Sequence, residues 1–184
     1  MRKIYKTALK DLTAWLCVLT VTFILYGCPY SSAFKIDSDP SIPVEDVFLG
    51  KWATVTSDQN GKSLSIKMII DKKDDFEYNI NFTGNISSLK RYIDIKDDTI
   101  KTTAFVSEAA SRRFLNIHLF EQYYIVEFIY KDDKITLLPL CEHFTSRLIK
   151  SDAEIRPSLE QHYKTRLYPL YDNEFCLKEM VRVN

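Results

Sequence analysis

The stretch FEYNINF, residues 76–82, alternates strictly between apolar and polar side chains. Side chains of a β-strand point alternately to opposite faces, so this period of two predicts a strand with one buried face. The preceding stretch SLSIKMII, residues 63–70, places an apolar side chain at every second position in the same way. Together the two stretches predict a pair of half-buried antiparallel strands.

Further segments of the same character follow along the chain. They are TIKTTAFV (99–106), RFLNIHLF (113–120), YYIVEFIY (123–130), KITLLPL (134–140) and FCLKEMVRV (175–183), with RYIDI (91–95) as a shorter candidate. These segments are rich in β-branched and aromatic residues, which favour strands. Asn60-Gly61 predicts a hairpin turn because both residues accept positive φ angles. The sequence therefore predicts a mainly all-β fold.

Pairs of aspartates recur between the predicted strands, in KKDDF (72–76), IKDDT (95–99) and YKDDK (130–134). Such carboxylates could be calcium ligands, but a calcium site needs about six to eight converging oxygen atoms. Aspartate also forms hydrogen bonds with nearby backbone in tight turns. We therefore interpret these pairs as the tips of hairpins.

The exception to the strands is SDAEIRPSLEQHYKTRL, residues 151–167. Ser151 followed by Glu154 resembles a capping box, which marks the start of a helix. Pro157 lies inside the segment, so the helix is expected either to bend or to begin there. Apolar residues recur at helical spacing, at Ile155, Leu159, Tyr163 and Leu167. The pattern predicts one amphipathic helix, packed on the outside of the sheet and followed by a final strand.

The N-terminal region has the layout of a secretory signal. Four basic residues lie within residues 1–11, and no charged residue occurs from Leu12 to Gly27. This uncharged run is short for a membrane-spanning helix, which needs about 20 apolar residues. The region could therefore be an uncleaved signal anchor or an ordinary secretory signal. A third interpretation is the signal peptide of a lipoprotein.

The last four residues of this region, LYGC (25–28), resemble a bacterial lipobox. The resemblance implies that residues 1–27 are a signal peptide that is removed, and that Cys28 becomes the lipidated first residue of the mature protein. Two or three acyl chains, at about 0.8 kcal/mol per buried methylene, anchor a protein stably to a membrane.

Removal of residues 1–27 leaves 21 basic and 24 acidic residues, so the mature chain has no basic footprint for nucleic acid. Residues 28–47 are rich in proline and serine and show no period, which predicts a tether between the lipid and a domain spanning residues 48–184. The residues directly after Cys28 are uncharged. This favours a lipid anchor in the outer membrane that faces the periplasm.

The start of that domain, FLGKW (48–52), resembles the glycine–any residue–tryptophan signature of the lipocalins, a branch of the calycins. The resemblance implies an up-and-down β-barrel of antiparallel strands, with a helix before the last strand. It also implies that Trp52 packs across the closed end of the barrel beneath an arginine, for which Arg147 is the candidate. Together Gly50, Trp52 and Arg147 would close the barrel.

The resemblance has limits. The threonine–aspartate–tyrosine motif of many lipocalins is missing. The chain also resembles small lipoproteins of the Bacteroidota that begin their domain with a similar LGKW, a likeness that supplies no activity.

Patterns typical of enzymes and metal sites are weak. The sequence contains no glycine-rich phosphate loop. Cys141, Glu142 and His143 are adjacent, but alternate residues of a strand face opposite ways, so a third ligand such as His118 would be needed. We expect no catalytic residue, no metal and no cofactor. Cys141 and Cys176 could form a disulfide in an exported protein or could be separate core residues.

Three hypotheses for the function remain. The first is a lipid-anchored barrel that binds a small apolar or amphipathic molecule, since an eight-stranded barrel can hold one small ligand. The second is a structural or protein-interaction lipoprotein with a packed barrel and no ligand. The third, an enzyme, is the least favoured because no nucleophile–base or metal arrangement is visible. For the first hypothesis, the residues expected to line the interior are Phe76, Tyr78, Phe82, Phe105, His118, Tyr124 and Phe128.

Overall fold

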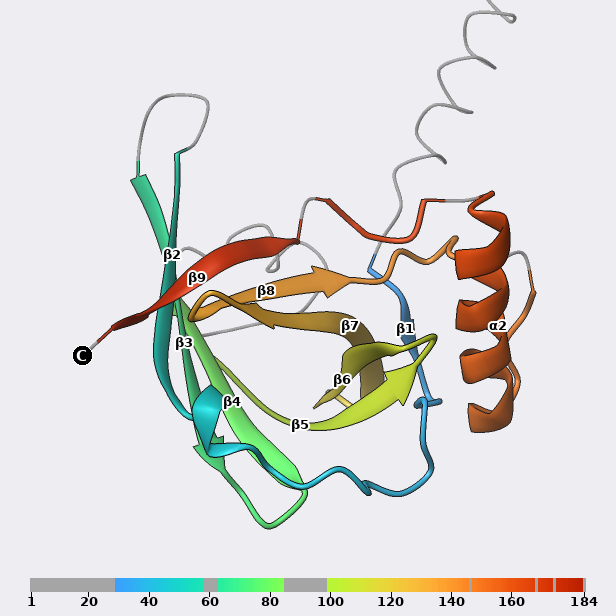
Figure 1. The fold of residues 1–184 in the computed structure, drawn as a ribbon, viewed down its shortest axis with the longest axis horizontal. Helices are drawn as coiled ribbons and strands as arrows, with labels where there is room; N and C mark the ends of the chain where they lie inside the picture. The colour runs from blue at the N-terminus through green and yellow to red at the C-terminus, as the bar shows by residue number, and fades with distance from the viewer. Residues whose placement is uncertain are drawn as a thin grey trace, which may run out of the picture.

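The computed structural model describes residues 29–57, 63–84, 99–145, 147–167, 169–173 and 175–183. It is a closed barrel of eight antiparallel strands with one helix on its outside (Figure 1). The fold predicted from the sequence is confirmed, and the barrel is compatible with a lipocalin-like fold. Residues 1–28, the turn at Asn60-Gly61 and the candidate strand 91–95 lie outside the described residues.

Seven barrel strands follow one another along the chain and pair with their neighbours. They are β2 (Gly50–Ser57), β3 (Ser63–Lys72), β4 (Glu77–Gly84), β5 (Thr99–Ala109), β6 (Arg112–Leu119), β7 (Gln122–Lys131) and β8 (Lys134–Pro139). The eighth, β9 (Leu177–Val183), pairs with both β8 and β2 and closes the ring. A register shift between Ile135 and Leu137, together with a positive φ at Glu179, marks a bulge between β8 and β9.

The described hairpin turns explain several sequence patterns. Asp132 and Asp133 both have positive φ and form the tip between β7 and β8, as predicted. In the turn between β3 and β4, Asp74 Oδ1 accepts hydrogen bonds from the backbone N–H groups of Phe76 and Glu77, each 2.9 Å long. The remaining pair, Asp97-Asp98, lies outside the described residues.

The helix α2 (Asp152–Thr165) begins at the N-cap Ser151 and runs through Pro157 without ending. The capping box is only partly formed, because the Ser151 side chain makes no cap bond and Glu154 Oε2 accepts from the Lys150 N–H instead, at 2.8 Å. The helix ends at Arg166, whose φ of 51° is left-handed. Among the described residues, no helix has both the length and the apolar character needed to cross a membrane.

The structure has two apolar cores that share the wall made by β5, β6 and β7. The inner core fills the barrel and includes Trp52, Met68, Tyr78, Ile80, Val106, Leu115, Phe128, Ile135 and Met180. The outer core lies between the wall and α2 and includes Tyr30, Ile36, Ala109, Phe114, Ile125, Leu140, Phe144, Ile155 and Leu159. The helix therefore packs on the outside of the sheet, as its amphipathic pattern predicts.

Residues 29–47 do not form the free tether that their composition suggested. β1 (Ser31–Ser32) pairs with β7, and the buried Ile36 donates its N–H to Asn116 Oδ1 at 2.8 Å. The segment then crosses to the other side of the barrel and ends in the 3₁₀ helix η1 (Asp46–Phe48), as Figure 1 shows. Specific side-chain contacts hold this segment, although it has neither a helical nor a strand period.

Candidate functional site

One end of the barrel is closed around Trp52. The indole is fully buried, and its Nε1 donates a hydrogen bond to the Phe48 carbonyl at 2.9 Å. The guanidinium of Arg182 lies 4.5 Å from the ring centroid, a cation–π geometry. Arg182 also donates to the carbonyls of Leu49 at 2.5 Å and Val47 at 2.6 Å. The arginine thus ties the indole, η1 and β9 together.

The arginine over Trp52 was expected to be Arg147, and that assignment is wrong. Arg182 pairs directly with Trp52 across the ladder between β2 and β9, which places its side chain at the closed end. Arg147 is exposed in the connection between β8 and α2. The resemblance placed the arginine near the end of the last barrel strand. In this chain that strand follows the helix, so the arginine lies in β9 and not in the residues after β8.

Gly50 belongs to the same arrangement. Its φ of 123° is accessible to glycine but strained for other residues, and a Cβ atom there would lie 2.7 Å from Arg182 Nη1. The glycine at the start of β2 therefore leaves the space that the guanidinium occupies. Gly50 and Trp52 are both placed at the barrel-closing site, as the resemblance implied.

The closed half of the barrel interior is filled by side chains. The Phe48 ring packs edge-on against Phe128, with centroids 4.7 Å apart, and against Tyr130, at 5.5 Å. The remaining space is about 10 Å³, at or below the roughly 10–15 Å³ that one water molecule needs. It is lined by Phe48, Ile70, Tyr78, Ile80, Val106, Leu115 and Phe128. This part of the interior has no room for a small molecule.

Four of the seven residues expected to line the interior belong to the inner core or pack against it. They are Tyr78, Phe82, Tyr124 and Phe128. Tyr78 also has a polar contact, because its hydroxyl accepts the Glu45 N–H at 2.9 Å and so fixes the segment that leads into η1.

The other three expected residues lie elsewhere. Phe76 is 41% exposed in the turn between β3 and β4. Phe105 is buried but faces outward, because its neighbours in β5 belong to the inner core and Lys35 Nζ lies 5.8 Å from its ring. His118 is exposed on the outer wall, with its ring 4.8 Å from that of Tyr123. The prediction that these three line the interior is wrong.

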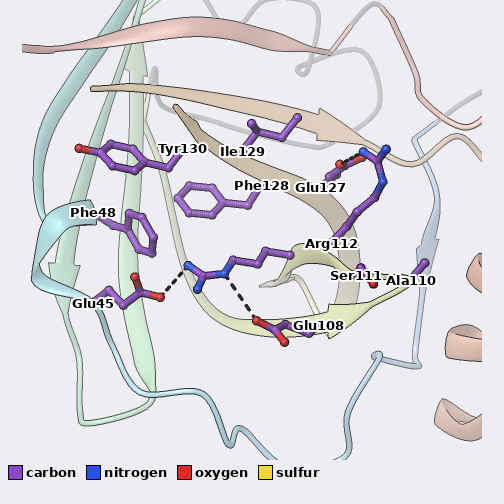
Figure 2. A pocket seen from close by; sticks show the side chains of 11 residues that line it. Glu45, Phe48, Glu108, Ala110, Ser111, Arg112, Glu127, Phe128, Ile129 and Tyr130 are labelled. Carbon is purple, nitrogen blue, oxygen red and sulfur yellow. Dashed lines mark hydrogen bonds and ion pairs between the residues drawn. The ribbon is translucent and has the colours of Figure 1, made fainter. Parts of the chain in front are cut away.

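A cleft opens at the rim of the barrel, where the β5–β6 hairpin bends away from β7 (Figure 2). The register between β6 and β7 ends at Phe114 and Glu127, whereas β7 continues to Lys131 paired with β8. The cleft has a volume of about 930 Å³. We call it the rim cleft; it is lined by Glu45, Phe48, Glu108, Ala110, Ser111, Arg112, Arg113, Glu127, Phe128, Ile129 and Tyr130.

The two sides of the rim cleft differ in chemistry. Figure 2 shows Phe48, Phe128 and Tyr130 on one side and the hairpin that carries the arginines on the other. The guanidinium of Arg113 lies between two carboxylates, 2.7 Å from Glu45 and 3.6 Å from Glu108. Because all three of these charged side chains are partly exposed to solvent, their ion pairs are weak and can exchange partners.

The Glu127 side chain at the far end of the cleft is only 2% exposed. Its Oε1 accepts from Arg112 Nη1 at 2.5 Å, and its Oε2 accepts from the hydroxyls of Tyr163, at 3.1 Å, and Tyr171. The Arg112 guanidinium also lies 4.7 Å from the centre of the Tyr163 ring. We call these four residues the Glu127 network. It joins the barrel wall to α2 and to the segment before β9.

Burial shifts the pKa values of the two phenols in this network. Loss of hydration raises the pKa of Tyr163 to about 12, and it raises the pKa of Tyr171 as well, where the hydrogen bond to Glu127 adds to the effect. The hydrogen bond to Glu127 likewise raises the pKa of Arg112. At neutral pH both phenols are therefore protonated, and the Arg112 guanidinium is charged.

The residues around Cys141 do not gather into a metal site. The Cys141 thiol is buried and donates to the Pro169 carbonyl at 2.8 Å, whereas Glu142 and His143 are exposed. Within the described ranges, no group of three or more histidine, cysteine, aspartate or glutamate side chains could hold a metal ion. Cys141 and Cys176 are both free thiols, and burial raises the pKa of each. A raised pKa makes a thiol less reactive.

A comparison of the chain with protein families, with curated proteins and with solved structures finds no match. The candidate site therefore rests on the geometry of the rim cleft and on the residues that line it.

Proposed function

We propose that this chain is a lipid-anchored, lipocalin-like protein of the bacterial cell envelope whose barrel binds a small amphipathic molecule at the rim cleft. The role is binding and not catalysis. The resemblance of residues 25–28 to a lipobox supports the anchor, and the closed barrel is compatible with a binding module.

The observation that carries the binding proposal is the composition of the rim cleft. Its volume of about 930 Å³ falls in the range of about 300–1,000 Å³ that small-molecule sites occupy. Aromatic side chains offer an apolar surface, and Arg113, which lies between Glu45 and Glu108, offers a donor for an anionic or polar head group. A ligand carboxylate or phosphate would replace Glu108, the more distant partner of Arg113 at 3.6 Å.

The alternative is a structural or protein-interaction lipoprotein without a ligand. The packing of the closed half of the interior favours it, because the space that remains there is about 10 Å³. Both functions are consistent with this packing of the closed half, and they differ in whether the rim cleft takes up a small molecule.

The binding test uses a dansyl-labelled fatty acid, which is both apolar and anionic, with the detergent-extracted full-length protein. Ile129→Asp places a charge in the lining of the cleft, and we expect it to weaken binding at least about tenfold, because burying an unpaired charge is costly. Phe120→Asp is the matched control, since Phe120 is exposed at the tip between β6 and β7 and does not line the cleft. Equal affinities for the two variants and the parent would refute a site in the rim cleft.

The anchor has a separate test. We expect Cys28→Ser to leave the protein unprocessed or to release it from the membrane fraction, and intact-mass measurement to show the loss of the acyl chains. A variant that stays in the membrane with the same lipid mass as the parent would rule out lipidation at Cys28.

A further inference from the structure

The residues that directly follow Cys28 are part of the folded barrel wall. Pro29 forms a bridge with Cys141, and the Tyr30 N–H donates to the Leu140 carbonyl at 2.8 Å. Ser31 and Ser32 then pair with β7. Consecutive Cα atoms are about 3.8 Å apart, so a lipid on Cys28 would begin one residue away from the domain surface.

This connection is much shorter than the tether expected from composition. Nineteen free residues could have spanned about 60 Å and held the barrel clear of the membrane. With the segment folded onto the wall, the part of the surface around Pro29 must lie at the level of the lipid head groups. The orientation of the barrel at the membrane is then set by its own structure.

The surface beside Pro29 has an apolar side chain that is suited to this position. The Cys141 N–H donates to the Leu170 carbonyl at 2.9 Å, which brings the segment after α2 next to the first described residues. Leu167 precedes Leu170 by three residues, a span of at most about 11 Å. It is 74% exposed, although it continues the apolar positions of the helix. Figure 1 shows the end of α2 and the start of β1 on the same side of the barrel.

The charges around Leu167 are also compatible with a lipid surface. Lys164 and Arg166 are exposed at the end of α2, and Glu142 is an exposed acid beside Cys141. A basic side chain close to an anionic leaflet contributes about 1 kcal/mol. Leucine inserts readily into the boundary between head groups and acyl chains.

The geometry points to a docking face for the membrane, made by Pro29, Lys164, Arg166 and Leu167, that rests on the head-group layer of the leaflet holding the anchor. We call it the anchor face. The inference rests on the proposed lipidation of Cys28 and goes beyond it, because it assigns one orientation to the barrel. The turn between β3 and β4 lies on the opposite side of the barrel in Figure 1 and points away from the bilayer.

The test uses the lipidated full-length protein in vesicles that contain phosphatidylglycerol and brominated lipids, which quench tryptophan on contact. Leu167→Trp places a reporter on the anchor face, and Phe76→Trp places a matched one on the turn between β3 and β4. The background is favourable because Trp52 is fully buried, and Trp15 lies in the signal peptide. We expect the fluorescence at position 167 to fall at least about twofold, since an interfacial side chain reaches about 5–10 Å into the boundary layer. We expect no change at position 76.

A second variant tests whether the short connection between Cys28 and the barrel sets the orientation of the anchor face. Twenty glycine and serine residues inserted between Cys28 and Pro29 give a flexible linker of about 25 Å root-mean-square length. We expect this protein to float with vesicles as before but to lose the quenching at position 167.

The outcomes distinguish the two proposals. A protein that floats with vesicles but shows equal quenching at positions 167 and 76 would overturn the anchor face and leave the lipid anchor standing. A protein that does not float would overturn both. Quenching that survives the linker insertion would show that the short connection does not set the orientation.

Discussion

The inner and outer cores share one wall but are built differently. Among the described residues the inner core is mainly apolar, and the Arg182 guanidinium lies over its Trp52 at the closed end. The outer core contains the buried side chains of Asn116 and Glu127, both with several hydrogen-bond partners. Apolar packing tolerates more than one arrangement, whereas buried polar groups are costly unless each finds its partner. The outer core thus specifies where α2 and the N-terminal segment attach.

The first prediction concerns a substitution that disrupts the inner core. Trp52→Ala removes the largest fully buried side chain, so we expect a loss of about 3–5 kcal/mol in the free energy of unfolding. Urea unfolding followed by circular dichroism measures it. A loss below about 1 kcal/mol would mean that the barrel collapses around the missing ring.

The second prediction concerns substitutions in the Glu127 network, which lies in the outer core. Glu127→Ala removes the carboxylate that accepts from both phenols and from Arg112, and leaves the phenols only their hydrogen bond to each other, so we expect a loss of about 2–4 kcal/mol. Arg112→Ala should cost less because Arg112 reaches solvent. A double-mutant cycle reports the coupling between the two residues. Additive effects would show that the ion pair does not contribute to the attachment of α2.

The third prediction compares the two arginines proposed to cover Trp52. Arg182→Ala removes a cation–π contact and two hydrogen bonds to backbone carbonyls, and we expect a loss of about 1–3 kcal/mol. Arg147→Ala should change the free energy of unfolding by less than about 0.5 kcal/mol, since the side chain is exposed. The same urea assay ranks the two, and the reverse order would restore Arg147 as the closing residue.

The smallest expected effect is the pH dependence of the stability that Tyr163 contributes. Tyr163→Phe removes one hydrogen bond to Glu127 and should cost about 1 kcal/mol at neutral pH. The folded pKa of Tyr163, about 12, lies above its ordinary value of 10.0. Its stabilising contribution is therefore complete below pH 10 and is lost as the pH rises through 12. Urea titrations between pH 8 and a value near 12 should show the two proteins converging. A constant difference would contradict the raised pKa.

Periodicity alone predicted most of the fold. The alternation in FEYNINF was sufficient for β4, and the helical spacing of Ile155 and Leu159 was sufficient for α2, because one face of each is buried and the other is wet. The barrel itself was implied by the resemblance of FLGKW to the lipocalin signature, taken together with the order of strands, helix and last strand.

The outward position of Phe105 was missed because β5 is buried on both faces, so alternation no longer separates inside from outside. The near-continuous apolar run AFV at residues 104–106 was the available signal. Glu127 was not singled out within the predicted strand YYIVEFIY. Its partners Tyr163 and Tyr171 are far along the chain, and no local pattern shows that α2 covers it.

The N-terminal segment was mistaken for a tether for a related reason. It is held by single contacts, such as the Ile36 N–H to Asn116 and Glu45 to Arg113, and these leave no repeat in the sequence. Composition indicates whether a segment can form a regular element, but an irregular segment can still dock through such isolated contacts.

The position of β9 has a consequence for how this chain acquires its shape. The strand that closes the ring comes after the helix and pairs with β2, whose partner residues lie more than a hundred positions earlier, as in Trp52 with Arg182. Such non-local closure is entropically costly and slows folding. Until β9 docks, β2 and β8 each expose an unpaired edge that can pair with another chain. A chain whose last residues have not yet docked therefore holds an open sheet that is prone to aggregate, and the pairing of β9 with β2 and β8 removes both edges.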